Sequence, residues 1–446
     1  KKSYKFADVA NKNYYDKEIS GKYADDGVQA KKKTIREEDI SVSEKYNSVK
    51  DDATYKRLSS QYLPNKKDVF LGDSNDYTKR LEFNDYVDSA YSVKPDMETA
   101  TALTKPNSFN INDYMPTIDY DNHTVTANGG ITFGNGSTKL DDFRVTSSKN
   151  EQYLVADGKN KWLSNGLERY DWTRVAERDG SYAVIIGNAN QKHGNMDVGR
   201  KNKGCTLVVD GNLNVNDELQ IQKNSVVIVT GNLTCGKLFM KDGARLYVKG
   251  NITANDMSYD GDSNQKIYCG GNAIIPHNLD STREFKIGGN LDAHELSLTY
   301  TNYYFGGSIK CTKFNAENND MNLIVDSFEC SGTTTLNNRT SLTVNGNAKT
   351  GTINMYNDSV ISVCGSMSSK NEQNLFQSSK IIVNGVALLG TLNLRGDSKL
   401  YATGGAQFAG RINAYDNAIV NVDNAIMCND LVWLEGNAKV YANASF

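Results

Sequence analysis

Beyond about residue 200, apolar residues alternate with polar ones, and a Gly-Asn step interrupts the alternation at regular intervals. Full steps stand at Gly211-Asn212, Gly231-Asn232, Gly250-Asn251, Gly271-Asn272, Gly289-Asn290 and Gly346-Asn347, with weaker versions at residues 307, 326, 365, 385, 405 and 424. Successive steps lie 18 to 21 residues apart, and one repeat has about 19 residues. A fixed period of this length is typical of repeat proteins in which each unit packs on its neighbours.

The residues two and four positions before the steps form apolar columns, as Val209 and Leu207 do before the first step. The coil at Asn322 breaks the second of these columns, which predicts a local shift of register there. Period-2 alternation predicts strands with one buried face. A second turn signal between steps, such as Asn224-Ser225 or Asp358-Ser359, uses residue types that tolerate positive φ. The leucine-rich repeat pattern is absent. The prediction is an all-β, single-stranded β-solenoid of about 12 coils with about 19 residues per coil.

The composition divides the chain into three expected regions. Residues 1–124 are charged and rich in tyrosine, and we expect mixed or partly irregular structure there. Residues 125–204 contain Trp162 and Trp172 and are expected to form a β-rich cap, because an open solenoid end exposes unpaired strand edges. Residues 205–446 form the expected solenoid. Four of the five prolines precede residue 120, which separates the first region from the repeats.

The column three positions before each step should face outward, and it is apolar only in the first coils. Its first members are Val208, Ile228, Tyr247, Tyr268, Lys286 and Tyr304, mostly apolar or aromatic, and it becomes mostly polar later. An apolar outer face implies a cover or a partner. One interpretation is that part of residues 1–200 folds back over it.

The other interpretation of this column is an exposed platform of aromatic side chains. Tyr247, Tyr268 and Tyr304 would stack on successive sugar rings of an extended glucan. Tyr300 and Tyr303 are candidates to extend the platform, although Tyr303 belongs to an inward column.

Seven cysteines follow residue 200, and four of them share one position in the coil: Cys235, Cys311, Cys330 and Cys428. Other coils place alanine or threonine there, so these cysteines are expected to be core thiols. A disulfide between Cys311 and Cys330, in adjacent coils, is the alternative. Asp260, Asp262 and Asn264 resemble the start of a calcium loop but lack the later Gly and the closing Glu, which leaves only a weak candidate for calcium and no other cofactor.

Catalysis by a solenoid requires carboxylates at matched positions on neighbouring coils. The residue just before each step shows no acidic cluster, and no Ser-His-Asp arrangement is found by spacing, so the sequence favours a protein that is not an enzyme. The net charge of −3 gives no reason to expect a nucleic-acid partner.

The Gly-Asn-Leu coils resemble those of clostridial-type surface β-helix proteins and, more distantly, the bactofilin repeat. Tyr14-Tyr15 and the tract from Tyr23 to Gln29 resemble the segment that follows the membrane helix of pilin-like proteins. Together these features resemble the tāpirins, β-helix adhesins linked to type IV pili of Gram-positive bacteria.

The tāpirin resemblance implies an extracellular or cell-surface location and non-catalytic binding of cellulose or another plant cell-wall glucan through exposed aromatic residues. It also implies pilus or cell-surface components as partners. The alternatives are a self-assembling structural filament protein and a polysaccharide-cleaving β-helix enzyme.

Overall fold

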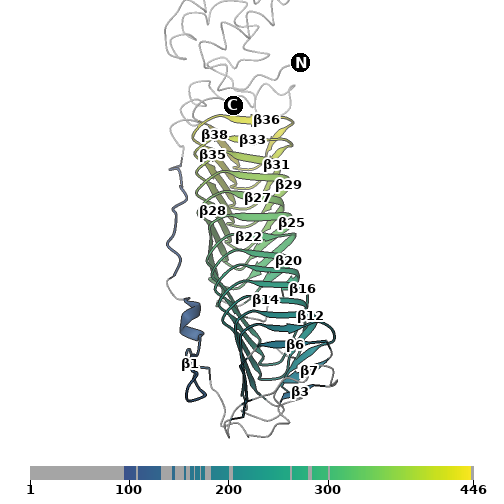
Figure 1. The fold of residues 1–446 in the computed structure, drawn as a ribbon. Helices are drawn as coiled ribbons and strands as arrows, with labels where there is room; N and C mark the ends of the chain where they lie inside the picture. The colour runs from purple at the N-terminus through teal and green to yellow at the C-terminus, as the bar shows by residue number, and fades with distance from the viewer. Residues whose placement is uncertain are drawn as a thin grey trace, which may run out of the picture.

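The computed structural model describes residues 95–106, 109–131, 143–145, 155–156, 161–164, 166–170, 172–175, 182–199, 204–261, 264–279, 284–299 and 302–442. Parallel strands stack coil on coil into a β-solenoid of about 13 turns between residues 162 and 442, which forms a rod (Figure 1). The fold class expected from the repeat is therefore confirmed. One short 3₁₀ helix, η5 (Ile111–Tyr114), occurs in the described part of the chain.

Each coil contributes a short strand to one face of the rod and a long, bent strand or two shorter strands to the remaining faces. The short strands of the first half form a nine-stranded sheet: β4 (Val155–Ala156), β5 (Lys161–Leu163), β8 (Tyr182–Ile186), β11 (Thr206–Asp210), β13 (Val226–Val229), β15 (Arg245–Val248), β17 (Lys266–Cys269), β19 (Glu284–Ile287) and β21 (Tyr304–Phe305). Those of the second half form a seven-stranded sheet: β24 (Asn322–Val325), β26 (Ser341–Val344), β28 (Val360–Val363), β30 (Lys380–Val383), β32 (Lys399–Ala402), β35 (Ile419–Val422) and β38 (Lys439–Ala442).

The remaining strands of the rod belong to one 20-stranded sheet that bends around the coil. They are β3 (Phe143–Val145), β6 (Leu167–Arg169), β7 (Thr173–Val175), β9 (Ala189–Gln191), β10 (Met196–Val198), β12 (Leu213–Ile221), β14 (Leu233–Lys241), β16 (Ile252–Asp260), β18 (Ala273–Leu279), β20 (Leu291–Leu298), β22 (Ile309–Cys311), β23 (Lys313–Glu317), β25 (Phe328–Asn337), β27 (Ala348–Met355), β29 (Met367–Leu375), β31 (Ala387–Leu394), β33 (Ala406–Phe408), β34 (Ile412–Ala414), β36 (Ile426–Cys428) and β37 (Val432–Leu434).

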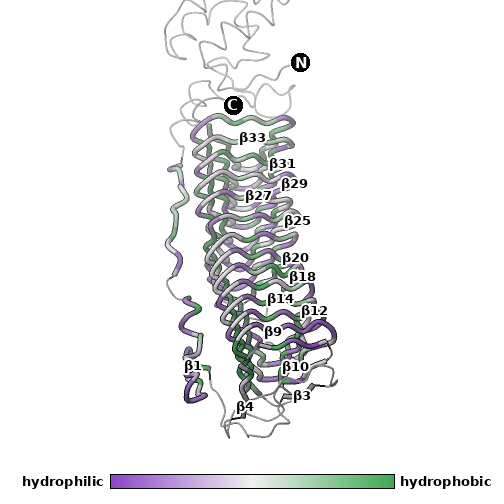
Figure 2. The backbone as a smooth tube through the Cα atoms, viewed as in Figure 1, coloured by the Kyte–Doolittle hydropathy of each residue, from purple (hydrophilic) through white to green (hydrophobic). Residues whose placement is uncertain are grey.

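Equivalent residues lie above one another, because the strands pair in parallel and in register. Val227, Leu246 and Ile267 form one inward column, and each is at most 1 % exposed. Such columns build one continuous apolar core along the rod. Figure 2 shows the hydrophobic positions recurring from coil to coil. Burial of a large apolar side chain contributes roughly 1.5–3 kcal/mol, so the columns are the main source of stability.

The Gly-Asn corner is held by hydrogen bonds between successive coils. The Oδ1 atom of Asn232 accepts from the backbone N–H of Asn251, and Oδ1 of Asn251 accepts from the N–H of Asn272, both at 2.8 Å. Glycine precedes the asparagine because the chain leaves no room for a side chain. A Cβ on Gly271 would overlap Oδ1 of Asn251 and lie 2.9 Å from the carbonyl oxygen of Gly250.

Two coils depart from the sequence alignment by one residue. Val325 pairs with Val344, so the coil before Asp326 lacks one residue at its corner; this is the register shift expected at Asn322. Gly404 rather than Gly405 is the corner glycine, because its N–H bonds to the carbonyl oxygen of Gly385. Tyr401 consequently faces outward and Ala402 inward, the reverse of the expectation.

The solenoid begins earlier than residue 205. β5 pairs in parallel with β8, which pairs in parallel with β11, so coils already occupy part of the expected cap of residues 125–204. Cap strands are nevertheless present at this end, because β4 pairs antiparallel with β5 and β3 pairs antiparallel with β7. The described boundary between cap and solenoid is thus corrected to the region of residue 161.

Residues 95–106 and 109–131 form an outer segment, hereafter the strap, that runs along the rod from its last coils to its first (Figure 1). It contains η5 and a hairpin of β1 (Thr117–Asp119) and β2 (Thr124–Thr126). The strap lies over the outward columns of the two short-strand sheets.

Replacement of Asn251 by alanine tests the corner bond. The N–H of Asn272 loses its acceptor, so we expect the free energy of unfolding to fall by about 1 kcal/mol, the net contribution of one hydrogen bond. Hydrogen exchange at the Asn272 amide measures this locally. Thr234→Ala, at an exposed position of a neighbouring coil, is the control and should leave that amide unchanged. Equal exchange in both variants would contradict the role of the ladder.

Candidate ligand-binding face

The outward column of the nine-stranded sheet is the face on which the sequence placed an aromatic platform. Register brings Ile228, Tyr247 and Tyr268 into one line, followed by Lys286 and Tyr304. The side chains of Tyr247 and Tyr268 meet, with ring centroids 5.2 Å apart and an edge-to-face angle of 86°. The spacing of the repeat therefore does collect these tyrosines on one side of the rod.

The strap covers the tyrosines with its own aromatic rings. Tyr114 stacks on Tyr247 at 5.5 Å with an interplanar angle of 13°, and it meets Tyr268 edge-on at 4.7 Å. The ring centroid of Phe109 lies 5.7 Å from that of Tyr268 and 5.4 Å from that of Tyr304. As a result, Tyr247 and Tyr268 are each only 3 % exposed.

The interpretation that part of residues 1–200 folds back over this face is confirmed, and the expectation of an exposed platform is corrected. The apolar cluster between strap and rod includes Ile111, Met115, Val208 and Ile228, which explains the apolar stripe. Tyr304 is only partly buried, beside a shallow hollow lined by Lys105 and Pro106.

The two remaining platform candidates do not join this face in the described structure. Tyr303 packs toward the core and stacks with Phe285 and Phe305, each at 6.4 Å. Tyr300 lies outside the described residues.

A carboxylate cluster adjoins the tyrosines. Glu284 accepts hydrogen bonds from the hydroxyl of Tyr268 and from Nδ2 of Asn302, and it lies 2.9 Å from Nζ of Lys266 and 3.5 Å from Nζ of Lys286. Burial acts to raise the pKa of Glu284, but hydrogen bonds from Lys266 and Tyr268 and the two lysine charges outweigh it and lower that pKa. Glu284 is therefore an ionised carboxylate that holds the hydroxyl of Tyr268. Its oxygen atoms are already engaged by Tyr268, Asn302 and the two lysines.

Burial under the strap also changes the tyrosines themselves. Desolvation raises the pKa of Tyr247 to about 12. Desolvation and the hydrogen bond to Glu284 raise the pKa of Tyr268 further. Tyr247 and Tyr268 therefore stay protonated and uncharged at neutral pH.

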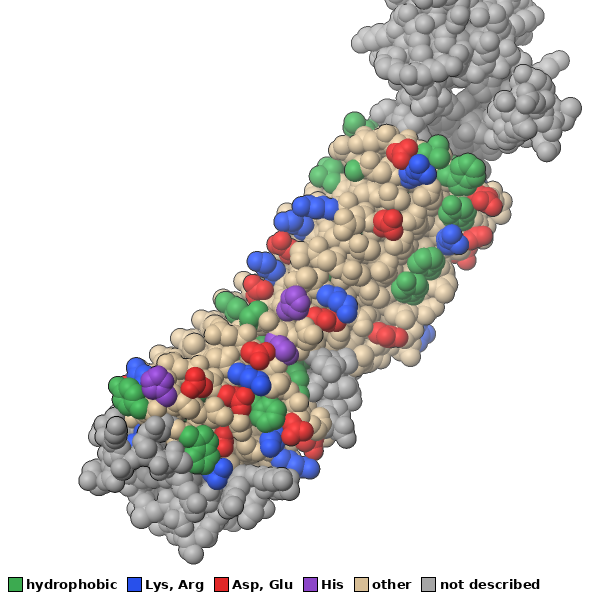
Figure 3. All heavy atoms as spheres, turned by 90° about the vertical axis from the view of Figure 1, so that its right-hand side faces the viewer, with side chains coloured by type: hydrophobic (Ala, Val, Ile, Leu, Met, Phe, Trp, Pro, Cys, Tyr) green, Lys and Arg blue, Asp and Glu red, His purple; other side chains and the backbone are tan. Residues whose placement is uncertain are grey.

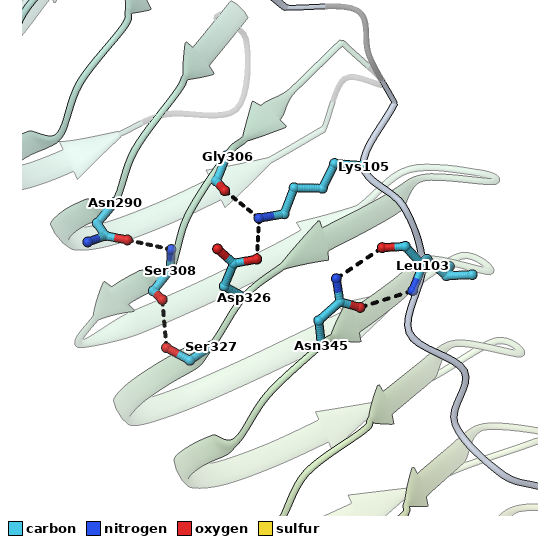
Figure 4. Close-up of polar contacts among 8 residues, drawn as sticks. All are labelled: Leu103, Lys105, Asn290, Gly306, Ser308, Asp326, Ser327 and Asn345. Atoms are coloured by element: carbon cyan, nitrogen blue, oxygen red, sulfur yellow. Dashed lines mark hydrogen bonds and ion pairs between the residues drawn. The ribbon is translucent and has the colours of Figure 1, made fainter.

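Farther along the rod the strap is fixed by polar contacts (Figure 4). Asn345 pairs with both backbone groups of Leu103 at 3.0 Å, and Asn384 pairs in the same way with Ala100 at 2.6 and 2.7 Å. Lys105 bonds to the carbonyl oxygen of Gly306 and to Asp326. Each asparagine amide uses one donor and one acceptor, which reproduces the pairing of a β-bridge.

The strap residues Phe109 and Tyr114 were not singled out in the sequence. Three prolines in the described strap, Pro95, Pro106 and Pro116, are the available signal, because proline favours extended backbone and excludes a continuous helix. This signal indicates an extended segment but does not indicate which face the segment covers.

A second aromatic column lies at the corner that follows the strands of the 20-stranded sheet and precedes the next short strand. The rings of Tyr356 and Phe376 are parallel within 3° at 5.1 Å, and the guanidinium of Arg395 lies 5.1 Å from the ring centroid of Tyr415. These groups occupy one position in successive coils. The two rings stack face to face in the first pair, and the guanidinium lies over the ring face in the second. Each pair occupies the ring faces that meet within it, which serves packing along the rod.

Carboxylates on the long strands are paired across coils. Glu218 lies 3.4 Å from Lys237, and Glu329 lies 3.2 Å from Lys349. Figure 3 shows one side of the rod on which charges of both signs are interspersed. Within the described ranges, no group of three His, Cys, Asp or Glu residues is placed to hold a metal. Asp260 and Asn264 are exposed, and Asp262 lies outside the described residues, so the calcium candidate stays a prediction.

Cys235, Cys311 and Cys330 are buried, as expected of core thiols, whereas Cys428, in the last coil, is only partly buried. Cys311 and Cys330 are in-register neighbours on β22 and β25, and both are free thiols.

Comparison of the chain with family models, with curated proteins and with solved structures gives no match. In the part of the chain that the structure describes, no helix has the length and apolar character needed to cross a membrane.

The raised pKa of Tyr247 predicts a pH-dependent loss of the strap. A tyrosine with a pKa near 10 when uncovered and about 12 when covered favours the covered state below pH 10. That contribution disappears as pH rises from 10 through about 12. Ultraviolet titration should show late-ionising tyrosines in the wild type and fewer in a Phe109→Ala, Tyr114→Ala variant. An identical titration of both proteins would contradict covering by these rings.

Burial of the thiols predicts the order of alkylation. Cys364 and Cys428 are partly buried, whereas the other five cysteines are buried, so these two should react first under native conditions. Mass spectrometry after a timed iodoacetamide treatment identifies the modified positions. Early modification of Cys269, which is 0 % exposed, would show that the coils open more readily than their packing indicates.

Proposed function

We propose that the chain is a non-catalytic cell-surface adhesin that binds an extended polysaccharide, such as cellulose or another plant cell-wall glucan. The observation that carries the proposal is the face formed by Tyr247, Tyr268 and Tyr304, which already accommodates two aromatic rings of the strap. A surface that stacks on Tyr114 and Phe109 also suits the flat C–H faces of sugar rings.

In this proposal the polysaccharide binds where residues 109–115 of the strap now lie. Those residues contact the rod through the side chains of Phe109, Ile111, Tyr114 and Met115. The opposite part of the strap is held by the paired amides of Asn345 and Asn384. The aromatic part can therefore separate while the strap stays attached elsewhere.

The polar groups around the face support binding rather than bond cleavage. Glu284 is surrounded by Lys266, Lys286 and Tyr268, and its pKa is lowered, which disfavours the protonated state that a general acid requires. The carboxylates of Glu218 and Glu329 on the long strands pair with lysines of neighbouring coils. A surface location and partners on the cell surface or pilus belong to the same proposal.

A pull-down of the full chain on crystalline cellulose tests the proposal. Phe109→Ala combined with Tyr114→Ala removes the covering rings, and we expect retention to rise about tenfold, since two aromatic contacts of about 0.5–1.5 kcal/mol each are lost from the covered state. Tyr247→Ala, Tyr268→Ala and Tyr304→Ala together should reduce retention to background, because the sugar rings lose their stacking surface.

The matched control is Tyr356→Ala with Phe376→Ala, an aromatic pair in later coils that does not belong to the cluster under the strap, and it should bind as the wild type does. Mannan and peptidoglycan presented side by side with cellulose identify the glycan. Equal retention of all variants on every glycan would refute the tyrosine face. Release of reducing sugar from any of them would refute the non-catalytic assignment.

A further inference from the structure

Two cysteines of neighbouring coils meet inside the rod. Cys311 on β22 and Cys330 on β25 are in-register partners, and both side chains belong to the core. Their burial is nearly complete, at 4 % and 0 % exposure. The thiols are so close that a hydrogen bond with Cys330 raises the pKa of Cys311. All seven cysteines lie in the described residues, and no other two of them are partners in a strand pair.

The coils that carry these cysteines meet at a junction, hereafter the seam, where two ladders of the rod are interrupted. β21, the last strand of the nine-stranded sheet, and β24, the first strand of the seven-stranded sheet, are not paired in the described structure. The asparagine ladder of the corners also changes at the seam. Asn290 still accepts from the backbone N–H of Ser308, whereas Ser308 and Ser327 are joined through their hydroxyls at 2.7 Å (Figure 4).

Non-covalent contacts from the long strands and the strap hold the seam together. β25 pairs with β22 and β23, and the backbone N–H of Asp326 bonds to the carbonyl oxygen of Gly307 at 3.1 Å. From the outside, Lys105 bonds to the carbonyl oxygen of Gly306 and to the carboxylate of Asp326 (Figure 4). The cysteine pair lies just after the corner, on the inner side of the same junction.

We propose that oxidation joins Cys311 and Cys330 by a disulfide that fastens the seam from the inside. The Cα atoms of in-register neighbours on parallel strands lie about 4.8 Å apart, within the range of about 4.4–6.8 Å found for disulfides. The Cβ atoms must approach to about 3.5–4.5 Å. The interrupted ladder between β21 and β24 leaves the coil room to make this small adjustment.

The reaction needs an oxidant of the disulfide class, such as oxidised glutathione. The thiolate of one cysteine attacks a sulfur of the oxidant, which forms a mixed disulfide and releases one small thiol. The other cysteine then attacks the protein sulfur of the mixed disulfide and releases the second small thiol. The oxidant takes up the two electrons and the two cysteine protons. Because both cysteines are buried, the exchange takes place while the coils are locally open.

Incubation of the full chain with reduced and oxidised glutathione tests the bond, in urea kept below the unfolding transition so that coils open locally. Trypsin cleaves after Lys310, Lys313 and Arg339, so the two cysteines fall on separate peptides, 311–313 and 314–339. We expect mass spectrometry without reduction to find these peptides joined. Peptides that stay separate, or a bond from either cysteine to a different cysteine, would overturn the proposal.

Cys235→Ala is the matched control, because Cys235 holds the same coil position but has Val215 and Ala254 as its in-register neighbours. It should leave the cross-link unchanged, whereas Cys330→Ala should abolish it. Both variants should fold, because other coils place alanine at this position, as Ala254 and Ala293 show.

Hydrogen exchange measures whether the bond fastens the seam. The Asp326 amide, which bonds across the seam to Gly307, should exchange about tenfold more slowly in the oxidised chain than in the reduced chain, because the cross-link disfavours local opening. Cys330→Ala should show no dependence on oxidation. Equal exchange of the Asp326 amide in both states of the wild type would refute the fastening role. None of these measurements uses polysaccharide, so their outcome is independent of the proposed function.

Discussion

The bond between the asparagine side chain of one coil and the backbone N–H of the next is the constraint on which the other features depend. It fixes the corners of successive coils at the same point from Asn212 through Asn232 and Asn251 to Asn272. The corner glycines allow the coils to approach closely enough for that bond. With the corner fixed, the strands on either side stay in register, and inward and outward columns persist along the rod.

Outward columns determine where the strap can lie and how it is held. In the first half, Val208, Ile228 and the tyrosines make the outside apolar, and the strap meets them with Ile111, Tyr114 and Met115. In the second half the outside is more polar, and amides of Asn345, Asn384 and Asn421 bind the strap backbone instead. A small apolar cluster of Ala100, Ile382 and Tyr401 supplements those bonds. One segment is thus attached by two kinds of contact along its length.

The repeat could be predicted because its signals are local. Within each strand the alternation of apolar and polar residues shows which side chains face inward, since successive side chains point to opposite faces. Coils that are one residue shorter or longer than their neighbours are harder to align from the sequence. The missing residue before Asp326 was visible, whereas the alternative glycines Gly404 and Gly405 gave no sequence criterion, and Tyr401 was assigned to the wrong face. The sequence predicted that some segment would cover the apolar outer column, since a large exposed apolar surface implies a cover or a partner. The residues of the covering segment could not be predicted, because Phe109 and Tyr268 are far apart in sequence and no repeat relates them.

A cover over a binding face lowers apparent affinity by the fraction of molecules in which it is open. If one molecule in about a hundred is open, the loss is about 2.7 kcal/mol, which is modest compared with several stacked sugar rings. Opening need not disturb the rod, because the cluster beneath the strap is separate from the core that runs through the coils. The paired amides of Asn345 and Asn384 keep the far part of the strap attached. The arrangement therefore permits local opening at the tyrosines at a cost set by a few ring contacts, and not by unfolding.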